Sequence, residues 1–322
     1  MHRGQIKRLF VAAAIGVGLL TTAVHAEDAY PTKPIKVIVP FGAGGGSDLT
    51  ARVLQKAIDD QGTLSQPLTI INVPGAAGSI GAREVLHASP DGYTILMHHV
   101  ALLSRQAAGL ADFGYEDFEP IAGTVLYSHV LAVPKDSPYQ TVGELLDAAA
   151  ENPNTLVMGA NLGGNTHMIG LMLEDARDGA KFRMAQIGGD ADNFAALAGK
   201  QIDVAAFSAS SYQSFEGSNI RPLAMLNDER WPTLPDLPTA AEQGVPVSFS
   251  HYMYWLAPKG TPAEAIDKLE AALQSAMEDP AVQEAFSKRY SDPVFLNADQ
   301  LEERMAAQYQ WIEPYAERST KK

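Results

Sequence analysis

The sequence predicts an α/β fold of two lobes, with mixed, mainly parallel sheets, joined by a hinge. Short apolar, β-branched runs alternate with helical patterns along the chain, as in a sheet whose parallel strands are connected by helices. Several of these runs end in Gly, Ser, Asn or Thr rather than in charged residues. Two extended segments, near residues 124–132 and 222–228, are suited to cross between the lobes and to serve as a hinge.

The first 26 residues have the pattern of a secretory signal. Three basic residues precede the apolar stretch Leu9–Val24, which is short and rich in small residues for a membrane span. The small residues around His25 fit a signal-peptidase site, so we expect cleavage after Ala26 and a periplasmic location. The alternative is an uncleaved N-terminal anchor.

Composition narrows the function classes. Cleavage would leave 296 of the 322 residues and remove three basic and no acidic residues, which takes the formal net charge from −14 to −17. Such a charge disfavours binding to nucleic acid or to an anionic membrane. The chain has no cysteine, and so neither a disulfide framework nor a thiol nucleophile. We expect a monomer without a metal or another cofactor.

The segment Ile35–Arg52 begins with a buried strand, continues through a glycine-rich turn and ends in a helix. Glycines let the backbone turn sharply with little side chain in the way, and Ser47 is a good N-cap candidate. Unpaired N–H groups at a helix start form an anion site in outline. The candidate ligand-binding residues of this loop are Phe41, Gly42, Ala43, Gly44, Gly45, Ser47 and Asp48.

Two familiar nucleotide motifs do not fit this loop. A P-loop requires Gly-Lys-Ser/Thr, and no lysine lies between Phe41 and Gln55. A dinucleotide fingerprint requires glycine at its sixth position, where this chain has Ser47, and an acidic residue after the next strand. That strand, Leu68–Val73, ends without an acid.

The rest of the chain continues the alternation. Turn residues follow the strand at 68–73, a helix at 80–88 and a strand at 93–97 come next, and an extended segment covers 121–133. A second glycine-rich turn, Gly159–His167, links a strand to a helix as the first turn does. Further strands are expected at 155–158, 181–187, 202–207 and 220–226, and helices at 262–277 and 298–317. Because ligands collect at the carboxyl ends of strands in open α/β sheets, this order describes a hinged solute-binding protein.

Several motifs in sequence order resemble one family over nearly the whole mature chain. They are YPTKPIKVIVPFGAGGGSDLTAR (30–52), PGAAGSIGA (74–82), SPDGYTIL (89–96), DFEPIA (117–122), GKQIDV (199–204), LPDLPTAAEQG (234–244) and LAPKGTP (256–262). The chain resembles the Bug-type extracytoplasmic receptors of tripartite tricarboxylate transporters. The resemblance implies a type II periplasmic binding protein fold, a small organic acid as ligand and inner-membrane permease subunits as partners. It also implies that main-chain N–H groups and ordered water from Phe41–Asp48 hold a carboxylate, with the loop Gly159–His167 opposite.

With this fold we expect one lobe from 27–124 plus 229–322 and the other from 125–228. Three departures from the family pattern lie where side chains would face the distal part of a ligand: Gln186-Ile187-Gly188, the spacing of His167, and His98-His99. They suggest a substrate that differs from the family's usual one. The remaining candidate ligand-binding residues are His98, Asn161, Asn165, Thr166, His167, Gln186 and Ser208.

Alternatives stay open at this point. The ligand could be an aliphatic mono- or dicarboxylate, a tricarboxylate, an aromatic acid or an acidic amino acid. For His98 and His99 the structural alternative is one imidazole within the sheet and one at a lobe surface. A periplasmic sensor for a two-component kinase is the second function, and a hydrolase is a remote third. We expect no enzyme, because the chain has no G-x-S-x-G elbow and Ser47 has no nearby histidine in sequence.

Overall fold

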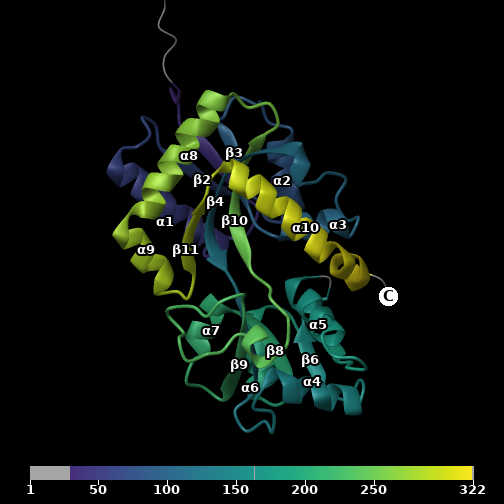
Figure 1. Ribbon diagram of the computed structural model, residues 1–322. Coiled ribbons are helices and arrows are strands. Elements are labelled where there is room, and N and C mark those ends of the chain that lie inside the picture. The colour runs from purple at the N-terminus through teal and green to yellow at the C-terminus, as the bar shows by residue number, and fades with distance from the viewer. Residues whose placement is uncertain (1–29, 163, 321–322) are drawn as a thin grey trace, which may run out of the picture.

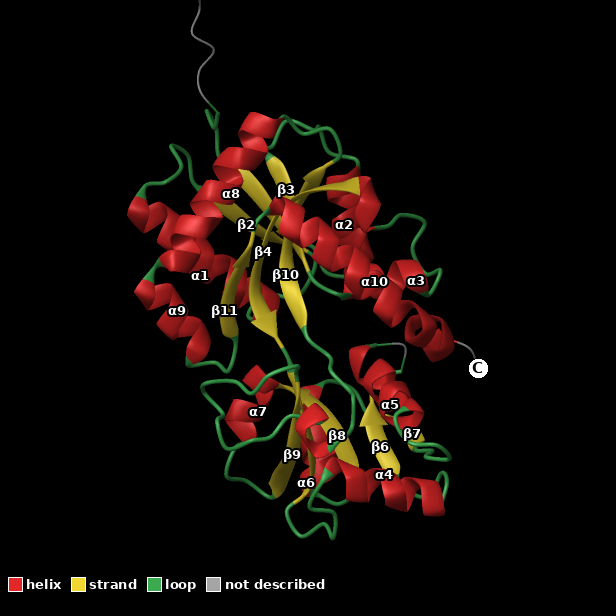
Figure 2. Cartoon of the chain, in the orientation of Figure 1, coloured by secondary structure: helices red, strands yellow, loops and turns green. Residues whose placement is uncertain are grey.

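The computed structural model describes residues 30–162 and 164–320, so the expected signal segment lies outside the described residues. As predicted, the fold has two lobes (Figure 1). Each lobe has a sheet with helices packed around it (Figure 2). In the described part of the chain, no helix combines the length and the apolar character that a membrane span needs.

The first lobe is built on a six-stranded sheet in the order β11-β4-β10-β3-β1-β2. Side chains of β1 alternate between its two faces, as the period of a strand requires: Val37 and Val39 face one apolar cluster and Ile38 faces another. The strands are β1 (Ile35–Val39), β2 (Leu68–Asn72), β3 (Thr94–His98), β4 (Phe118–Tyr127), β10 (His251–Pro258) and β11 (Asp292–Leu296).

Helices cover both faces of this sheet. Apolar side chains of α1, α8 and α9 pack on the face that carries Val37, and those of α2, α3 and α10 pack on the face that carries Ile38. The helices are α1 (Gly46–Gln61), α2 (Ser79–Leu86), α3 (Ala101–Ala107), α8 (Ala263–Glu278), α9 (Pro280–Ser287) and α10 (Ala298–Thr320), with 3₁₀ turns at Ala76–Gly78 and Tyr115–Asp117.

The second lobe is built on a five-stranded sheet in the order β7-β6-β8-β5-β9. Its strands are β5 (His129–Pro134), β6 (Val157–Ala160), β7 (Arg183–Gln186), β8 (Val204–Ser208) and β9 (Ile220–Leu226). Its helices are α4 (Val142–Glu151), α5 (Asn165–Asp175), α6 (Asp190–Ala198) and α7 (Ala209–Phe215); a 3₁₀ turn, Ala241–Gln243, lies between β9 and β10.

Both sheets are mixed as expected, but the prediction that they are mainly parallel is wrong. Among the described strands, four neighbouring pairs are parallel and five are antiparallel. The reason is the crossing of the chain between lobes. β5 and β10 each start at the end of a lobe where the neighbouring strands β8 and β3 finish, so they run against those strands.

The crossings also determine which strand ends face the other lobe. Only Ser128 separates β4 from β5, whereas residues 227–250 separate β9 from β10. His129, at the start of β5, pairs with Ser208 at the end of β8, and Tyr254 of β10 pairs with His98 at the end of β3. The carboxyl ends of β1 and β3 in one lobe, and of β6 and β8 in the other, therefore point toward the region between the lobes.

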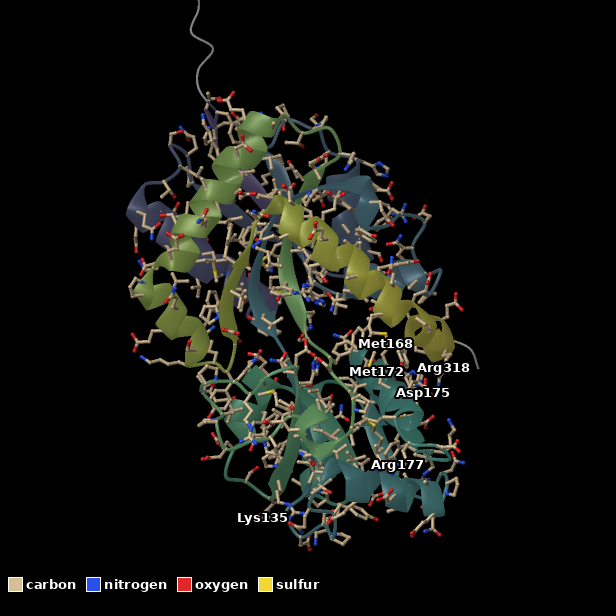
Figure 3. The ribbon with its side chains drawn as sticks, viewed as in Figure 1. Lys135, Met168, Met172, Asp175, Arg177 and Arg318 are labelled. Atoms are coloured by element: carbon tan, nitrogen blue, oxygen red, sulfur yellow. The ribbon has the colours of Figure 1, made fainter. Side chains whose placement is uncertain are left out.

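Helix α10 connects the two lobes on the Ile38 side of the first sheet. Its last turns lie next to α5 (Figure 3), where Met168 and Met172 share an apolar cluster with Ile312 of α10. Arg318 of α10 makes a two-pronged ion pair with Asp175 of α5, with N–O distances of 2.5 and 3.1 Å. The C-terminal helix is thus a second physical link between the lobes besides the crossing strands.

Candidate functional site

The glycine-rich loop after β1 is held in shape by Asp48, which is 2% exposed. Its carboxylate accepts hydrogen bonds from the Gly44 N–H at 2.8 Å, from Arg52 Nε at 3.0 Å and from Asn72 Nδ2 at 3.0 Å. Asn72 also donates to the Phe41 carbonyl at 3.1 Å. Burial tends to raise the pKa of Asp48, but these donors outweigh it and leave the pKa below its ordinary value. Asp48 therefore positions the loop and stays ionised.

The helix start lies two residues earlier than expected, and the prediction of Ser47 as N-cap is wrong. Helix α1 begins at Gly46 with Gly45 as its N-cap, and Ser47 is buried within the first turn with its hydroxyl 4.0 Å from Met253 Sδ. Gly45 has no side chain with which to cap the helix. Asp48, three residues further on, holds the loop instead by accepting from the Gly44 N–H. Within the described residues, the N–H groups of Gly46, Ser47 and Asp48 have no acceptor. They are the donors that this helix start offers to an anion.

The second glycine-rich loop, after β6, has its own braces. Thr166 Oγ1 accepts from the Asn161 N–H at 2.8 Å, and Gln186 Oε1 accepts from the Leu162 N–H at 2.7 Å. The Asn161 carbonyl accepts from the Gly164 N–H at 2.8 Å, just before α5 begins. The predicted residues Asn161, Thr166 and Gln186 thus form one hydrogen-bonded unit, in which Gln186 supports the loop from the neighbouring strand.

The other two predicted residues of this loop, Asn165 and His167, are half-buried in the first turn of α5. Burial lowers the pKa of His167 below its ordinary value, opposed by Glu174 and by a hydrogen bond with the backbone of Ser319. His167 therefore lies against the end of α10 and belongs to the contact between the lobes.

Ser208, at the end of β8, is bound to the start of another helix. Asp190, the first residue of α6, accepts from the Ser208 N–H at 3.1 Å and from its hydroxyl at 2.7 Å. The same hydroxyl caps α7 by accepting from the Ser211 N–H at 3.3 Å. Ser208 fixes the relative positions of the starts of α6 and α7 at the lobe end that faces the first lobe.

His98 is 1% exposed and packed within the first lobe. Its Nδ1 accepts from the His99 N–H at 2.8 Å, and a Cβ on Gly78 would lie 2.4 Å from its Nε2, so the ring fills the space that this glycine leaves. Burial lowers the pKa of His98 to about 4. The ring is therefore neutral near pH 7, and in this structure it supports the loops rather than facing the space between the lobes.

His99 occupies the more open position. The residue is half-buried, and its ring stacks on Phe41 of the glycine-rich loop, with centroids 4.5 Å apart and planes 14° apart. The His251 ring follows at 5.3 Å, and the His129 ring lies 6.1 Å beyond His251. Sequence reasoning did not select His129 or His251 as ligand contacts. The only local signal was that His129 falls within the predicted crossing at 124–132.

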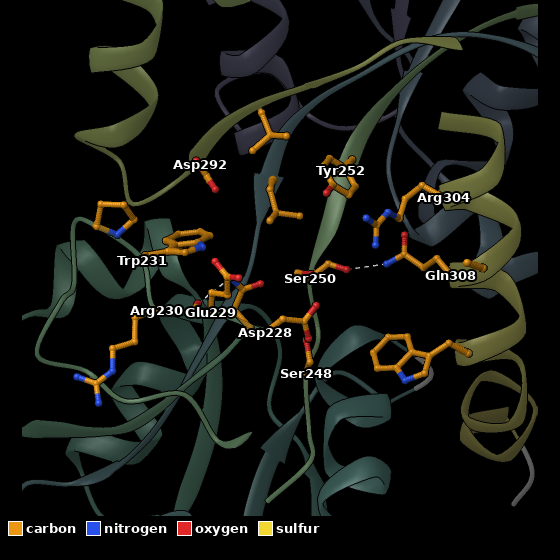
Figure 4. Close-up of a pocket in the computed structure, with 16 residues that line it drawn as sticks. Asp228, Glu229, Arg230, Trp231, Ser248, Ser250, Tyr252, Asp292, Arg304 and Gln308 are labelled. Atoms are coloured by element: carbon orange, nitrogen blue, oxygen red, sulfur yellow. Dashed lines mark hydrogen bonds between the residues drawn. The ribbon is translucent and has the colours of Figure 1, made fainter. Parts of the chain in front are cut away.

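A cavity of about 680 Å³ lies on the other face of the crossing strands (Figure 4). Leu126 and Tyr252 line it, whereas their neighbours Tyr127 and His251 face the opposite side, toward α1 and the histidines. Arg304 of α10 also lines it. None of the predicted site residues lines this cavity or a second one of about 530 Å³. Other lining residues of the first include Asp228, Glu229, Trp231, Ser248, Ser250, Asp292, Gln308 and Trp311.

Known proteins resemble this chain over most of its length. The model of the tripartite tricarboxylate transporter family receptor matches residues 50–315. A UPF0065 protein of Agrobacterium vitis is 31% identical over 297 residues, which cover 90% of this chain and 84% of that protein. BugT of Bordetella pertussis is 30% identical over 301 residues, covering 89% and 90% of the two chains.

Solved structures agree with the sequence comparison. A TctC solute-binding protein from Polaromonas has a TM-score of 0.78 and 28% identity over 89% of this chain and 99% of that one. The periplasmic binding protein BugD has a TM-score of 0.74 and 29% identity, covering 90% and 98%. The R. palustris protein Rpa4515, solved with adipate, has a TM-score of 0.76 and 25% identity, covering 90% and 98%. Together with the two-lobed fold, these matches show that the chain belongs to the tripartite tricarboxylate transporter receptor family, as a Bug-type solute-binding receptor.

Proposed function

We propose that this receptor captures a small organic carboxylate between its lobes in the periplasm and delivers it unchanged to the permease subunits of a tripartite transporter. The observation that carries the proposal is the start of α1, where three N–H groups without an acceptor among the described residues follow a loop that Asp48 and Asn72 hold rigid. A carboxylate satisfies such donors and interacts favourably with the helix dipole. The adipate bound to Rpa4515 supports this class of ligand.

The free energy of micromolar binding requires contacts from both lobes. A hydrogen bond to a charged group contributes about 1.5–3 kcal/mol. Micromolar affinity corresponds to about 8 kcal/mol, and association itself costs several kcal/mol more. Three N–H groups therefore fall short of micromolar binding. We infer that the loop Asn161–His167 and the region of Ser208 close on the ligand and supply the remaining contacts.

The closure is proposed as a rotation of the second lobe against the first, in which residues 125–228 move together with the segment that packs on β9, where the Ala240 N–H donates to the Met225 carbonyl and Gln243 to the Leu223 carbonyl. The crossings near 124–132 and 222–228 would be the hinge, and α10 would slide or separate at its contact with α5. Burying the ligand in this way creates a surface that differs from that of the open receptor, which the permease can recognise.

A screen of organic acids tests the proposal. In a thermal-shift assay, a carboxylate that binds the folded chain raises its melting temperature, and calorimetry then measures the affinity. We expect at least one acid of a panel that includes adipate to bind, with weak dependence on salt because buried contacts are poorly screened. We also expect NMR to recover that acid unchanged after incubation. A panel in which no acid binds would contradict the proposal, and conversion of the acid would show an enzyme instead.

A further inference from the structure

Three histidines that are distant in sequence form one cluster at the crossings between the lobes. We call His99, His251 and His129 the interlobe histidine cluster. His251 is the first residue of β10 and His129 is the first residue of β5. Consecutive ring centroids are 5.3 and 6.1 Å apart, and His99 stacks on Phe41 of the glycine-rich loop. The cluster thus runs from the anion-binding loop of one lobe to the end of β8 in the other.

Two atoms of the cluster have no hydrogen-bond partner in the part of the chain that the structure describes. His129 and His251 are 5% and 7% exposed, and Nδ1 of each is buried without a partner among the described residues. An unsatisfied buried polar atom costs about 1–3 kcal/mol, so two such atoms 122 positions apart in sequence and adjacent in space call for an explanation. In the tautomer that carries the ring hydrogen on Nε2, Nδ1 of a neutral imidazole is a base, so in that tautomer both atoms can accept a proton.

The groups around the interlobe histidine cluster favour the uptake of one proton rather than several. His98 at the end of β3, Tyr127 of β4 and Asp190 at the start of α6 are the titratable groups facing the cluster from the neighbouring elements. Burial lowers the pKa of each histidine in the cluster, to about 3 for His251. Asp190 and a hydrogen bond with the Phe249 backbone act in the opposite direction on His129. The cluster is therefore neutral at pH 7, and His129 is the member best placed to gain a positive charge.

We propose that the interlobe histidine cluster is the second anion-binding element of this receptor, which takes up a proton when a ligand with a second carboxylate is enclosed. This inference rests on the proposed function and specifies its ligand as a dicarboxylate. The first carboxylate occupies the start of α1, and the second approaches the histidines. A proton from the buffer adds to Nδ1 of His129 or His251, which breaks the bond to hydrogen in the buffer acid and leaves its conjugate base in solution, and the imidazolium pairs with the carboxylate. Because the cluster has members on both lobes, closure brings its charge and the ligand together.

Calorimetry with two matched acids tests whether the interlobe histidine cluster binds a second carboxylate with uptake of a proton. Adipate and hexanoate have the same number of carbons but two carboxylates and one. Each is titrated at pH 7.2 in PIPES and in Tris, whose ionisation enthalpies differ, so that proton uptake appears as a buffer-dependent heat. We expect adipate to bind about tenfold or more tightly than hexanoate, as for gain of a charged hydrogen bond. We also expect uptake approaching about one proton per adipate and none with hexanoate.

Variants assign the effect to the cluster. His129→Gln and His251→Gln should each remove most of the proton uptake and the preference for adipate, while hexanoate binding stays near that of the wild type. The exposed His87→Gln is the matched control and should leave both properties unchanged. If a buried variant fails to fold, His99→Gln at the partly exposed end of the cluster gives the same test.

The outcomes separate this inference from the proposed function. Adipate that binds no tighter than hexanoate, or that binds without proton uptake, overturns the role of the histidines while carboxylate capture stands. Variants that retain wild-type proton uptake overturn it as well. A screen in which no carboxylate binds at all contradicts the proposed function itself.

Discussion

Asp48 and Gly44 determine the shape of the loop after β1. Gly44 has φ of +79°, and its N–H points to the Asp48 carboxylate at 2.8 Å. A residue with a Cβ is strained in this left-handed region, although the space around Gly44 is open. The requirement for glycine there is therefore conformational rather than steric.

Replacement of Gly44 by alanine should weaken ligand binding more than it weakens the fold. We expect about 1 kcal/mol less stability from the positive φ, and about tenfold or more loss of carboxylate affinity because the following N–H groups turn away. Gly62→Ala, at the other end of α1 with φ of +63° and open space around it, is the matched control. It should show the same loss in urea unfolding and no loss in calorimetric affinity. Equal affinity for wild type and Gly44→Ala would remove this loop from the site.

The Asp48 carboxylate should also make the fold sensitive to acid. Its pKa is lowered in the folded chain, so it stabilises the fold above the unfolded pKa of about 4. That stability is lost as the pH falls through the lower folded pKa. Asp48→Asn should lower the free energy of unfolding at pH 7 by about 1–3 kcal/mol. The variant should then lose less further stability than the wild type between pH 5 and 2. Parallel curves for the two proteins in urea unfolding would count against this role.

Among the secondary-structure elements, the predictions succeeded where the signal was local. The strand β9 was predicted with its observed bounds, and α8 within one residue at each end, because turn residues and helical spacing mark both. β10 was missed, because all eight of its residues are buried and its sequence HYMYWLAP has no alternation. The proximity of His251 and His129 was not predicted for a related reason. It depends on how the strands are arranged in space, and the spacing of residues in the sequence does not specify that arrangement.

The glycine-rich loops were predicted as turns correctly, because glycine and helix-start patterns are short-range features. The roles of individual residues within them were harder to predict. Ser47 looks like a cap in sequence, but the Asp48 carboxylate accepts from the Gly44 N–H of the loop and from the Asn72 amide of β2, and the helix begins earlier. The ligand contacts predicted for these loops remain predictions.

Helix α10 offers a test of how the lobes are linked. Arg318→Gln removes the pair with Asp175 of α5, whose side chains are 37% and 42% exposed, so the free energy of unfolding should change by less than about 1 kcal/mol. The local separation of α10 from α5 should change more than the free energy of global unfolding does. We expect faster amide hydrogen exchange in α5 and in the last turns of α10 in the ligand-free chain.

The control is Arg83→Gln, which removes a comparable surface pair with Asp112 inside the first lobe. It should leave exchange in α5 unchanged. If both variants change α5 equally, or neither does, the ion pair is not a link between the lobes.

The whole chain is acidic, with a formal net charge of −14 for the printed sequence, yet its proposed ligand is an anion. The two are compatible because a diffuse surface charge is screened over about 8–10 Å in salt, whereas N–H donors at a helix start act at contact distance. The cavity behind the crossing strands is lined by the carboxylates of Asp228, Glu229 and Asp292 and by the guanidiniums of Arg304 and Arg230, of which Arg230 already pairs with Glu242, so it is less suited to a carboxylate. Capture of an anion therefore depends on local geometry on the α1 side.

A crystal structure with the tightest-binding carboxylate of the screen tests this account most directly. We expect the lobes to be closed and one carboxylate oxygen to lie about 2.7–3.2 Å from the N–H groups of Gly46 and Ser47. A ligand seated instead beside Arg304 and Trp231 behind the crossing strands, with the start of α1 unoccupied, would contradict it.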